Sequence, residues 1–600
     1  MPDSRFSQMF AQALCPCGLS RAAGLVLALH VGLMPSTTLG QESSALADQA
    51  GAASSPTSKW TAIIDGKETP APAISMGDEA TVLRLLELGT TDNRVMDHLR
   101  HLSFEIGPRL TGSTRLEQAE TWIQSLYTQW GLSNVRCEPW GEIATRFDRG
   151  PSSGRALLRR ETKQDDGTIK VEFEPLRDFT ISALSWSAGT GGPRQGPLFK
   201  EPITEEEFAA VKDKLRGAWI LLKAPAPIGQ RGIRGMLSDR FKMRELAREK
   251  VAKGEDAMSL SIPERLAFMG VAGYVSTSSD ERVWTGAAPD WRTRTVDQIP
   301  DEAHALIRRS DYDYVNSRLF DSEPFEVMFD LQHTLVAGPI AICNVIAEIR
   351  GSEKPDEVVI VSGHLDSWDG PGSQGTTDNG TGTAVTIEAA RLLIAANAKP
   401  LRTIRFIHWT GEEQGLLGSK AYVDKLKEAG QLDSISVMFN DDGGTNSQGG
   451  LAAADQMVEF LAAATAPITG RFLDTKDNKP LNVNVRAVGP RQKPGAGSDH
   501  ASFVAAGVPA FFWDEVGRAD YGYGWHTQHD RFDLAIEEYL KQSATNSAIA
   551  AYRLASAPAL LPRSEPEPPA EPSADAKPEG QPATPAATTT PPPTTPPSGS

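Results

Sequence analysis

The sequence feature that most constrains the fold is an alternation of apolar, strand-like segments with helix-like segments in the C-terminal half of the chain. The apolar segments cover residues 358–362, 403–409, 435–439 and 509–513, and helix-like segments at 381–395 and 419–429 lie between several of them. Buried strands that alternate with helices are typical of a mainly parallel sheet covered on both faces. We therefore predict an α/β fold with a mainly parallel, mixed sheet flanked by helices. Ligands of such sheets bind beyond the carboxyl ends of the strands.

Acidic and imidazole side chains follow each of these apolar segments. They are His364 and Asp366, then Glu412 and Glu413, then Asp441 and Asp442, and finally His526 and His529, while Asp378 lies in a glycine-rich loop that opens a helix. His364 and Asp366 share a face of an extended chain, which suits a histidine ligand supported by a carboxylate. Each residue alone is a weak signal, because a lone histidine or acidic pair usually lies on plain surface. Their convergence on one sheet edge predicts a metal site.

The donor set is coherent for zinc, which accepts histidine nitrogen and carboxylate oxygen. Only Cys137 and Cys343 lie beyond the first forty residues, and two cysteines cannot build a cysteine-based structural site. The sequence permits a disulfide between them but does not show that they meet. An aspartate that bridges two metals, with one histidine and one further carboxylate on each, would hold them about 3.5–4 Å apart. A remaining free carboxylate would serve as the general base.

The rest of the chain divides into regions with different predicted secondary structure. Residues 78–145 are expected to form an N-terminal helical part, with helices at 80–88 and 93–102 and a third helix opened by a capping box at Thr114 and Glu117. Residues 146–335 hold short strand candidates, at 218–222 and 270–276, and a charged segment, 238–253, which we interpret as a solvated helix face rather than a lid. We predict an inserted, smaller, β-rich domain there and a catalytic domain over 336–556.

Both ends of the chain are expected to lie outside the folded part. Residues 1–40 combine Arg5 and Arg21 with an apolar run over 22–34, which predicts a signal peptide and a secreted, periplasmic or cell-envelope protein. The run is short for a membrane span, which takes about 20 apolar residues. Residues 41–77 are expected to be a flexible leader, and 562–600 a disordered Pro- and Thr-rich tail. A net charge of −17 argues against a nucleic-acid partner.

Six motifs carry a family resemblance. They are HLDSWD (364–369), TTDNGTG (376–382), WTGEEQGLLGS (409–419), FNDDGG (439–444), GSDHASF (497–503) and WHTQHD (525–530). In this order they resemble the zinc exopeptidases of clan MH, family twenty-eight, most closely the carboxypeptidase Q-like and bacterial aminopeptidase members. GPRLTGS (107–113) resembles the N-terminal helical part of that family, and the insert matches the position of its protease-associated domain. The resemblance implies a zinc-peptidase-like fold and two Zn²⁺ per chain.

The resemblance also implies roles for individual residues. The implied metal ligands are His364, Asp378, Glu413, Asp442 and His526. Asp378 would bridge the two ions, Glu412 would be the base, and Asp366 would support His364. The peptide bond after Asp378 is implied to be cis. Asp441 competes with Asp442, and His529 with His526, with the family pattern favouring Asp442 and His526.

Three further histidine and acidic positions are interpreted as non-ligating. Asp499 and His500 are expected to line or support the pocket, and His408 to be packed inside its strand. The substrates implied are small peptides, read from one terminus. Arg491, Lys493 or Arg518 could meet a terminal carboxylate, and Asp499, Asp514 or Asp520 a terminal amine. We favour aminopeptidase over carboxypeptidase action. The alternatives are a metal-free peptide-binding protein on the same fold and a single-zinc acyltransferase or cyclase. Oligomeric state stays open.

Overall fold

The computed structural model describes residues 59–224, 242–320, 324–492 and 497–565. These residues all belong to one unit, Ser55–Ser600. The expected signal peptide, much of the expected leader and most of the expected tail therefore fall outside the described residues.

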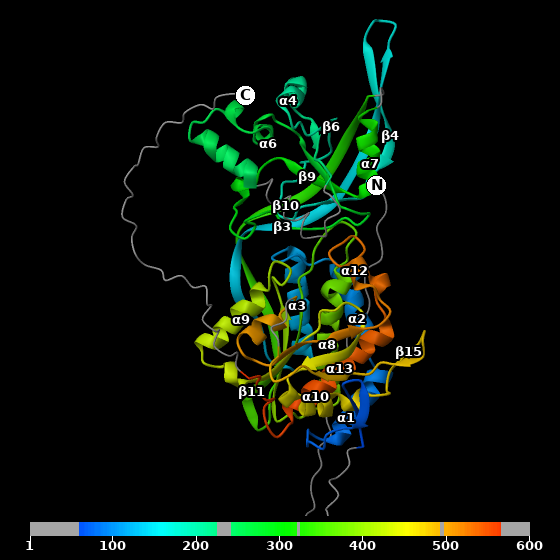
Figure 1. Ribbon diagram of the computed structural model, residues 1–600, viewed down its shortest axis with the longest axis vertical. Coiled ribbons are helices and arrows are strands. Elements are labelled where there is room, and N and C mark those ends of the chain that lie inside the picture. The colour runs from blue at the N-terminus through cyan, green and yellow to red at the C-terminus, as the bar shows by residue number, and fades with distance from the viewer. Residues whose placement is uncertain (1–58, 225–241, 321–323, 493–496, 566–600) are drawn as a thin grey trace, which may run out of the picture. The chain divides into compact units, whose positions relative to one another are not determined.

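A mixed sheet organises the C-terminal half of the chain (Figure 1). Its parallel strands follow the order β18 (Ala510–Phe512), β13 (Ile435–Asn440), β11 (Lys354–His364) and β12 (Arg402–Trp409). Strand β10 (Phe325–Ile349) joins β12 antiparallel. The predicted class, an α/β fold with a mixed sheet flanked by helices, is confirmed. Each of the four apolar segments forms one of the parallel strands.

Helices cover both faces of this sheet because alternate side chains of a strand point in opposite directions. Val359 and Val361 pack in one core cluster with residues of α8 (Thr381–Ala395) and α13 (Glu537–Ala555). Val358 and Ile360 pack in another cluster with residues of α9 (Leu417–Glu428) and α11 (His500–Ala505). Burial on both faces explains why these strands are continuous apolar runs.

Two long strands cross the expected domain boundaries. Strand β3 (Ser133–Lys163) pairs antiparallel with β10 from Ser133 opposite Glu348 to Leu158 opposite Phe325. The boundaries expected at 145/146 and 335/336 both fall inside this pair, so no linker separates the insert from the peptidase part. β-Bulges or irregularities shift the register at four places along this pair.

The inserted region is β-rich and continues the same sheet. Strands β6 (Arg194–Lys200), β7 (Trp219–Leu221), β8 (Gly273–Thr277), β9 (Ala303–Ile307) and β5 (Ile181–Ala183) extend it beyond β10, and β4 (Ile169–Asp178) pairs with β3. Its helices are α4 (Glu205–Val211), α6 (Ile262–Arg265), α7 (Arg309–Arg318) and a helix over 242–252. The last helix lies within the charged segment, where Lys250 pairs with Glu264 at 2.7 Å.

The N-terminal helices form as expected, with one change of cap. They are α1 (Glu79–Thr91), α2 (Val95–Arg100), a π-helical turn η1 (His101–Ile106) and α3 (Thr114–Gln129). The cap of α3 is Ser113, whose side chain accepts from the backbone N–H of Leu116. The capping box expected at Thr114 is therefore wrong, because Thr114 is already helical and its hydroxyl donates to Asp148 at 2.7 Å.

A second sheet contradicts part of the expected leader. Strands β1 (Thr61–Ile64) and β2 (Lys67–Pro70), inside the expected flexible segment 41–77, form a hairpin. The sheet order is β19 (Asp514–Val516), β14 (Ser447–Ala453), β17 (Asn484–Ala487), β1 and β2. Pairing of β1 with β17 supplies the order that the local composition did not predict.

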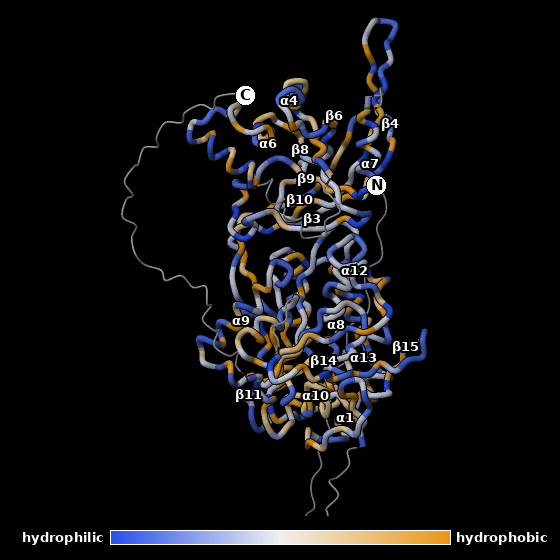
Figure 2. The backbone as a smooth tube through the Cα atoms, viewed as in Figure 1, coloured by the Kyte–Doolittle hydropathy of each residue, from blue (hydrophilic) through white to orange (hydrophobic). Residues whose placement is uncertain are grey.

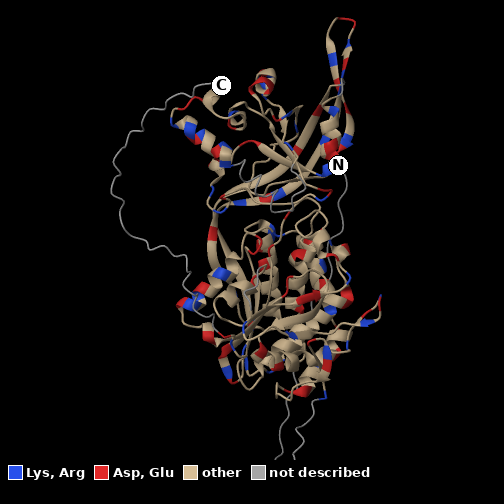
Figure 3. Cartoon of the chain, viewed as in Figure 1, with Lys and Arg blue, Asp and Glu red and all other residues tan. Residues whose placement is uncertain are grey.

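The start of the expected tail is also ordered. Arg563 donates from Nη2 to the carbonyl oxygens of Leu432 and Ile435, and Glu565 N–H donates to Pro490. The remaining elements are β15 (Leu473–Asp474), β16 (Lys479–Pro480), α10 (Val458–Thr465) and α12 (Tyr521–Gly524). Figure 2 shows hydrophobic residues around α10 and hydrophilic ones at β15. Charges of both signs are interspersed on outer helices such as α9 (Figure 3). Within the described residues, no helix is long and apolar enough to cross a membrane.

Candidate metal centre

One group of ligating side chains stands directly on the sheet. His364 is the last residue of β11, and Asp442 follows β13 by two residues. The Nε2 atom of His364 lies 3.0 Å from Asp442 Oδ1 and 3.4 Å from Asp378 Oδ1. We call His364 and Asp442 the sheet side of the site. Its position at the carboxyl ends of neighbouring parallel strands is the one the sequence predicts.

A second group is carried by loops. The Nε2 atom of His526 lies 3.0 Å from Asp378 Oδ2 and 2.9 Å from Glu413 Oε2. We call Glu413 and His526 the loop side. Asp378 belongs to both groups, and the candidate ligand atoms of each group lie within 4.8 Å of one another. The five residues proposed as ligands are thus brought together as two triads that share one aspartate.

The shared aspartate sits in a tightly bonded turn. Asp378 lies in the η6 segment (Thr376–Gly380), and the Asp378–Asn379 peptide bond is cis, as the resemblance implied. The Asn379 side chain donates to the Asp441 carbonyl at 2.7 Å and accepts from Gly382 N–H at 3.0 Å. A side chain at Gly382 would collide with the Asp441 carbonyl. The absence of a side chain at Gly382, the last residue of TTDNGTG, therefore lets the start of α8 pack against the end of β13.

The expected role of Asp366 needs a correction. His364 Nδ1 lies 2.8 Å from the backbone carbonyl of Asp366 and 3.8 Å from its carboxylate. A carbonyl only accepts, so Nδ1 carries the proton and Nε2 is left free to ligate. The Asp366 carboxylate instead accepts from the backbone N–H groups of Glu412 and Glu413, at 3.2 and 3.3 Å. It orders the loop of the base rather than the ring of His364.

Glu412 lines the same pocket as Asp378, Glu413 and Asp442 but belongs to neither triad. Its Oε2 atom lies 4.0 Å from His364 Nε2. Burial raises the pKa of Glu412 well above its ordinary value, and the nearby charge of Asp442 raises it further. Burial also raises the pKa of Glu413 to about 7. Carboxylates crowded this closely away from water need a neutralising cation.

The structure separates the competing residues. Asp441 turns away from the triads and accepts from Gln448 Nε2 at 2.6 Å. His529 stacks on Tyr523, with ring centroids 4.4 Å apart. His408 is buried in β12 with its Nε2 2.7 Å from the Tyr127 hydroxyl, as expected of a packed histidine.

The pocket above the triads has a volume of about 500 Å³. His500, Phe512, Asp514, Tyr521 and Trp525 line it beside the triads. Asp499 is buried next to His500, and burial raises its pKa to about 7.

The residues considered for binding a substrate terminus have different surroundings. Arg518 is engaged elsewhere, with Asp474 at 2.5 Å and Glu538 at 2.9 Å. Arg491 lies 3.9 Å from Glu565, and Lys493 falls outside the described residues. Asp514 lines the pocket, whereas Asp520 is exposed.

Three residues that support the site were not assigned a role from the sequence. The buried guanidinium of Arg109 donates to the carbonyls of Leu365 and Gly375, at 2.8 Å each. The Thr111 hydroxyl donates to the Asp366 carboxylate at 2.9 Å. The Asp530 carboxylate accepts from the backbone N–H of Thr376 at 3.0 Å. Arg109 and Thr111 belong to the GPRLTGS motif, and the family resemblance of this motif was the sequence signal that could have assigned them a supporting role.

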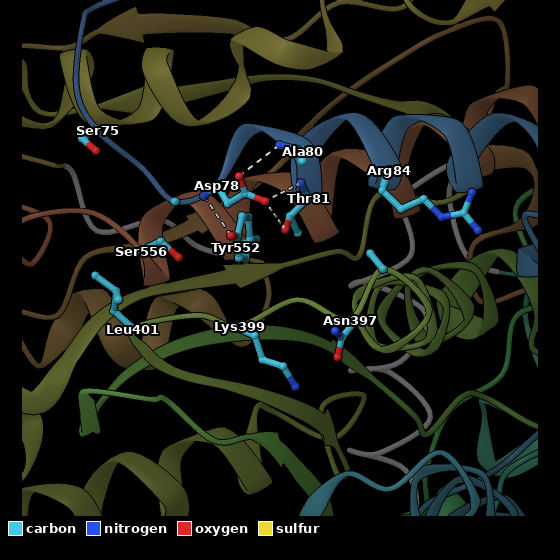
Figure 4. A pocket seen from close by; sticks show the side chains of 12 residues that line it. Ser75, Asp78, Ala80, Thr81, Arg84, Asn397, Lys399, Leu401, Tyr552 and Ser556 are labelled. Carbon is cyan, nitrogen blue, oxygen red and sulfur yellow. Dashed lines mark hydrogen bonds between the residues drawn. The ribbon is translucent and has the colours of Figure 1, made fainter. Parts of the chain in front are cut away.

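Two other features do not form comparable sites. A pocket of about 650 Å³ lies at the start of α1 (Figure 4). Asp78 caps the helix there with its carboxylate, and the backbone N–H of Asp78 donates to the Tyr552 hydroxyl. No histidine lines this pocket among the described residues. Residues 150–154 have the G-x-S-x-G spacing of a serine nucleophile, but they lie inside strand β3 rather than at a strand-to-helix turn.

Comparisons with known proteins identify the family of the chain. The family model "Peptidase family M28" matches residues 344–551. Mouse carboxypeptidase Q is 33% identical over 491 residues, which cover 80% of this chain and 90% of that protein. Human carboxypeptidase Q is 26% identical, over 82% of this chain and 91% of that protein. A crystal structure of a peptidase M28 precursor from Shewanella amazonensis SB2B, 23% identical, superposes with a TM-score of 0.51 and covers 81% of this chain and 98% of that one. The chain belongs to peptidase family M28 and is a zinc-dependent metallopeptidase.

Proposed function

We propose that this metallo-exopeptidase uses two zinc ions, held by two triads that share Asp378, to hydrolyse the terminal bond of peptides or dipeptides. The observation that carries the proposal is the shared aspartate, whose two oxygens face His364 and His526 separately. His364 and Asp442 would hold one ion, and Glu413 and His526 the other. Nitrogen and oxygen donors in this number fit zinc, and the buried carboxylates fit a cationic occupant.

The chain's own groups supply the proton transfers. Zinc, when bound, supplies a Lewis acid that polarises the scissile carbonyl and acidifies a water molecule. Glu412 faces the same space without belonging to a triad, so its carboxylate takes the proton from the attacking water and returns it to the leaving amine. Asp366 holds the backbone of Glu412 and so fixes the reach of this base.

The pocket supports recognition of a free amino terminus. Its carboxylates beyond the triads are Glu412 and Asp514, of which Asp514 also accepts from Arg486, and no lysine or arginine lines it among the described residues. An α-ammonium group is stabilised by a carboxylate, whereas a terminal carboxylate needs a cation. This favours aminopeptidase or dipeptidase action. The relatives named carboxypeptidase Q make the opposite polarity the alternative to test.

Export is part of the proposal. The signal-like segment 1–40 supports it, and so does the disulfide between Cys137 and Cys343, because structural disulfides persist in oxidising compartments. We propose a secreted or cell-envelope location for the enzyme.

The test is elemental analysis and turnover on one purified sample of the full chain. About two zinc per chain, with cleavage abolished by acetylation of the substrate's amino terminus, is the expected result. If amidation of the substrate's carboxyl terminus abolishes cleavage instead, the enzyme is a carboxypeptidase rather than an aminopeptidase. One zinc per chain would favour the single-zinc transferase or cyclase chemistry. Absence of zinc, and of activity after zinc is added, would favour a peptide-binding protein.

A further inference from the structure

A short segment of the inserted region contacts the loop that carries His526. In this segment, residues 281–286, Thr285 N–H donates to the His526 carbonyl at 3.2 Å, and Trp284 forms an isolated β-bridge with Thr527. We call residues 281–286 the anchor segment. It adds a two-residue piece of strand pairing to a loop that has no sheet of its own.

Gln528 joins the same two segments through its side chain. Its Oε1 atom accepts from Val283 N–H at 2.7 Å, and its Nε2 atom donates to the Glu281 carbonyl at 3.1 Å. The oxygen and the nitrogen of the Gln528 side-chain amide therefore both form hydrogen bonds with the backbone of the anchor segment. Arg282 adds a third contact, donating from Nη1 to the Gly522 carbonyl at 3.0 Å.

The backbone of His526 explains why such support matters. His526 has a φ of 59°, in the left-handed region that is unfavourable for residues other than glycine. A non-glycine residue keeps this conformation only when its surroundings impose it. The Asp530 carboxylate fixes the far end of the loop on the peptidase part, at Thr376 and Thr377. The anchor segment supplies the contacts at His526 itself.

A second contact reaches Glu413 from the same part of the insert. Ser185, whose N–H donates to Gly286 of the anchor segment at 2.9 Å, donates from its hydroxyl to the Asp369 carboxylate at 2.9 Å. Arg149 donates to the same carboxylate at 3.1 Å. Asp369 follows Trp368, whose backbone N–H donates to Glu413 Oε1 at 3.2 Å. Both loop-side residues are thus tied to the insert.

The sheet side is supported differently. The hydrogen bonds of His364 go to Asp366, Asp442 and Thr383, which all belong to the peptidase part. We propose that the inserted region positions Glu413 and His526 and thereby sets the zinc affinity of the loop side, while the sheet side binds zinc independently of it. The proposal rests on the two-zinc function above, and Gln528 and Ser185 are its positioning residues.

The experiment measures zinc affinity of the full chain by competition with a chromogenic chelator. Wild type is expected to lose zinc in two steps, and His526→Ala identifies the loop-side step by abolishing it. Gln528→Ala should weaken the loop-side step about 10–100-fold and leave the sheet-side step unchanged, as expected of a group that orients a ligand. Ser185→Ala should shift the same step less. Excess zinc should restore kcat of Gln528→Ala, which a folding defect would not allow.

Gln456→Ala is the matched control. The side chain of this glutamine also bonds two backbone groups, donating from Nε2 to the carbonyls of Pro490 and Arg563, but away from the site. It should change neither step. Unchanged loop-side affinity in both Gln528→Ala and Ser185→Ala, or an equal loss at both steps, would overturn the positioning role. A wild type with fewer than two zinc steps would instead overturn the two-zinc function itself, whatever the variants do.

Discussion

The sheet side and the loop side of the site hold equivalent residues on unlike supports. His364 and Asp442 stand at the ends of β11 and β13, whose side chains are buried on both faces. Glu413 and His526 stand on loops, and His526 needs a left-handed backbone. Buried strands are rigid because many packed neighbours fix each side chain, whereas loops depend on a few specific hydrogen bonds. The same ligand chemistry is therefore expected to respond differently to mutation on the two sides.

Removing the shared ligand should erase the difference between the two sides. Asp378→Ala deletes the only residue common to both triads, so both zinc ions and all activity should be lost. Elemental analysis of the purified, folded variant checks this. Retention of two zinc ions would show that Asp378 does not bridge, and retention of one would identify the side that binds without it.

Removing the base should leave both sides intact. Glu412→Gln keeps the shape of a side chain that belongs to neither triad, so zinc content should stay at the wild-type level while kcat falls about 10²–10⁴-fold. Steady-state kinetics and elemental analysis on the same sample measure the two quantities. Glu428→Gln, at an exposed position on α9, is the matched control. Zinc loss in Glu412→Gln would mean that this carboxylate ligates.

The sequence predicted the sheet side more completely than the loop side. Apolar runs ending in His364 and Asp442 could be placed on one sheet edge because parallel strands share a direction. The family pattern selected His526 over His529, but nothing in the local sequence indicated a left-handed residue or a loop held by residues 281–286. These contacts join positions about 240 apart, as with Val283 and Gln528, and no local pattern encodes them.

The errors have the same origin. The role of Asp366 was misjudged because a spacing of two residues places side chains on one face but does not distinguish a carboxylate from a backbone carbonyl as the partner of His364. Strand β1 was missed because its four residues pair not only with β2 but also with β17, more than 400 residues away. Periodicity reports burial of a segment, not its partner.

Weakening the carboxylate of Asp366 should separate the two sides. Asp366→Asn places an amide N–H among donors, next to the backbone N–H groups of Glu412 and Glu413, but keeps the carbonyl that orients His364. Loop-side zinc affinity and kcat should fall about 10–100-fold, with sheet-side affinity unchanged. Chelator competition and kinetics measure this, and Asp424→Asn, exposed on α9, is the control. A fall confined to the sheet side would contradict the assigned role.

Removing the disulfide should change stability without distinguishing the two sides. Cys137 and Cys343 join β3 to β10, with a sequence separation of 206. Replacing both with serine should lower the free energy of unfolding by about 2–4 kcal/mol, chiefly because the unfolded chain gains freedom. Denaturant unfolding of zinc-loaded protein measures the loss. A change in either zinc affinity would show that the disulfide also shapes the site.

Acid should lower the free energy of unfolding through His408, which is buried in β12. Burial lowers the pKa of His408 to about 3, so the folded protein holds this ring neutral while the unfolded chain protonates it near pH 6.5. Between these values the unfolded state binds the extra proton, so the free energy of unfolding falls as pH drops, by up to about 1.4 kcal/mol per pH unit. His408→Gln keeps a hydrogen-bond partner for Tyr127 but cannot titrate. Denaturant unfolding of both proteins from pH 7 to 5 should therefore give a smaller decline in the variant, and equal declines would place the acid sensitivity elsewhere.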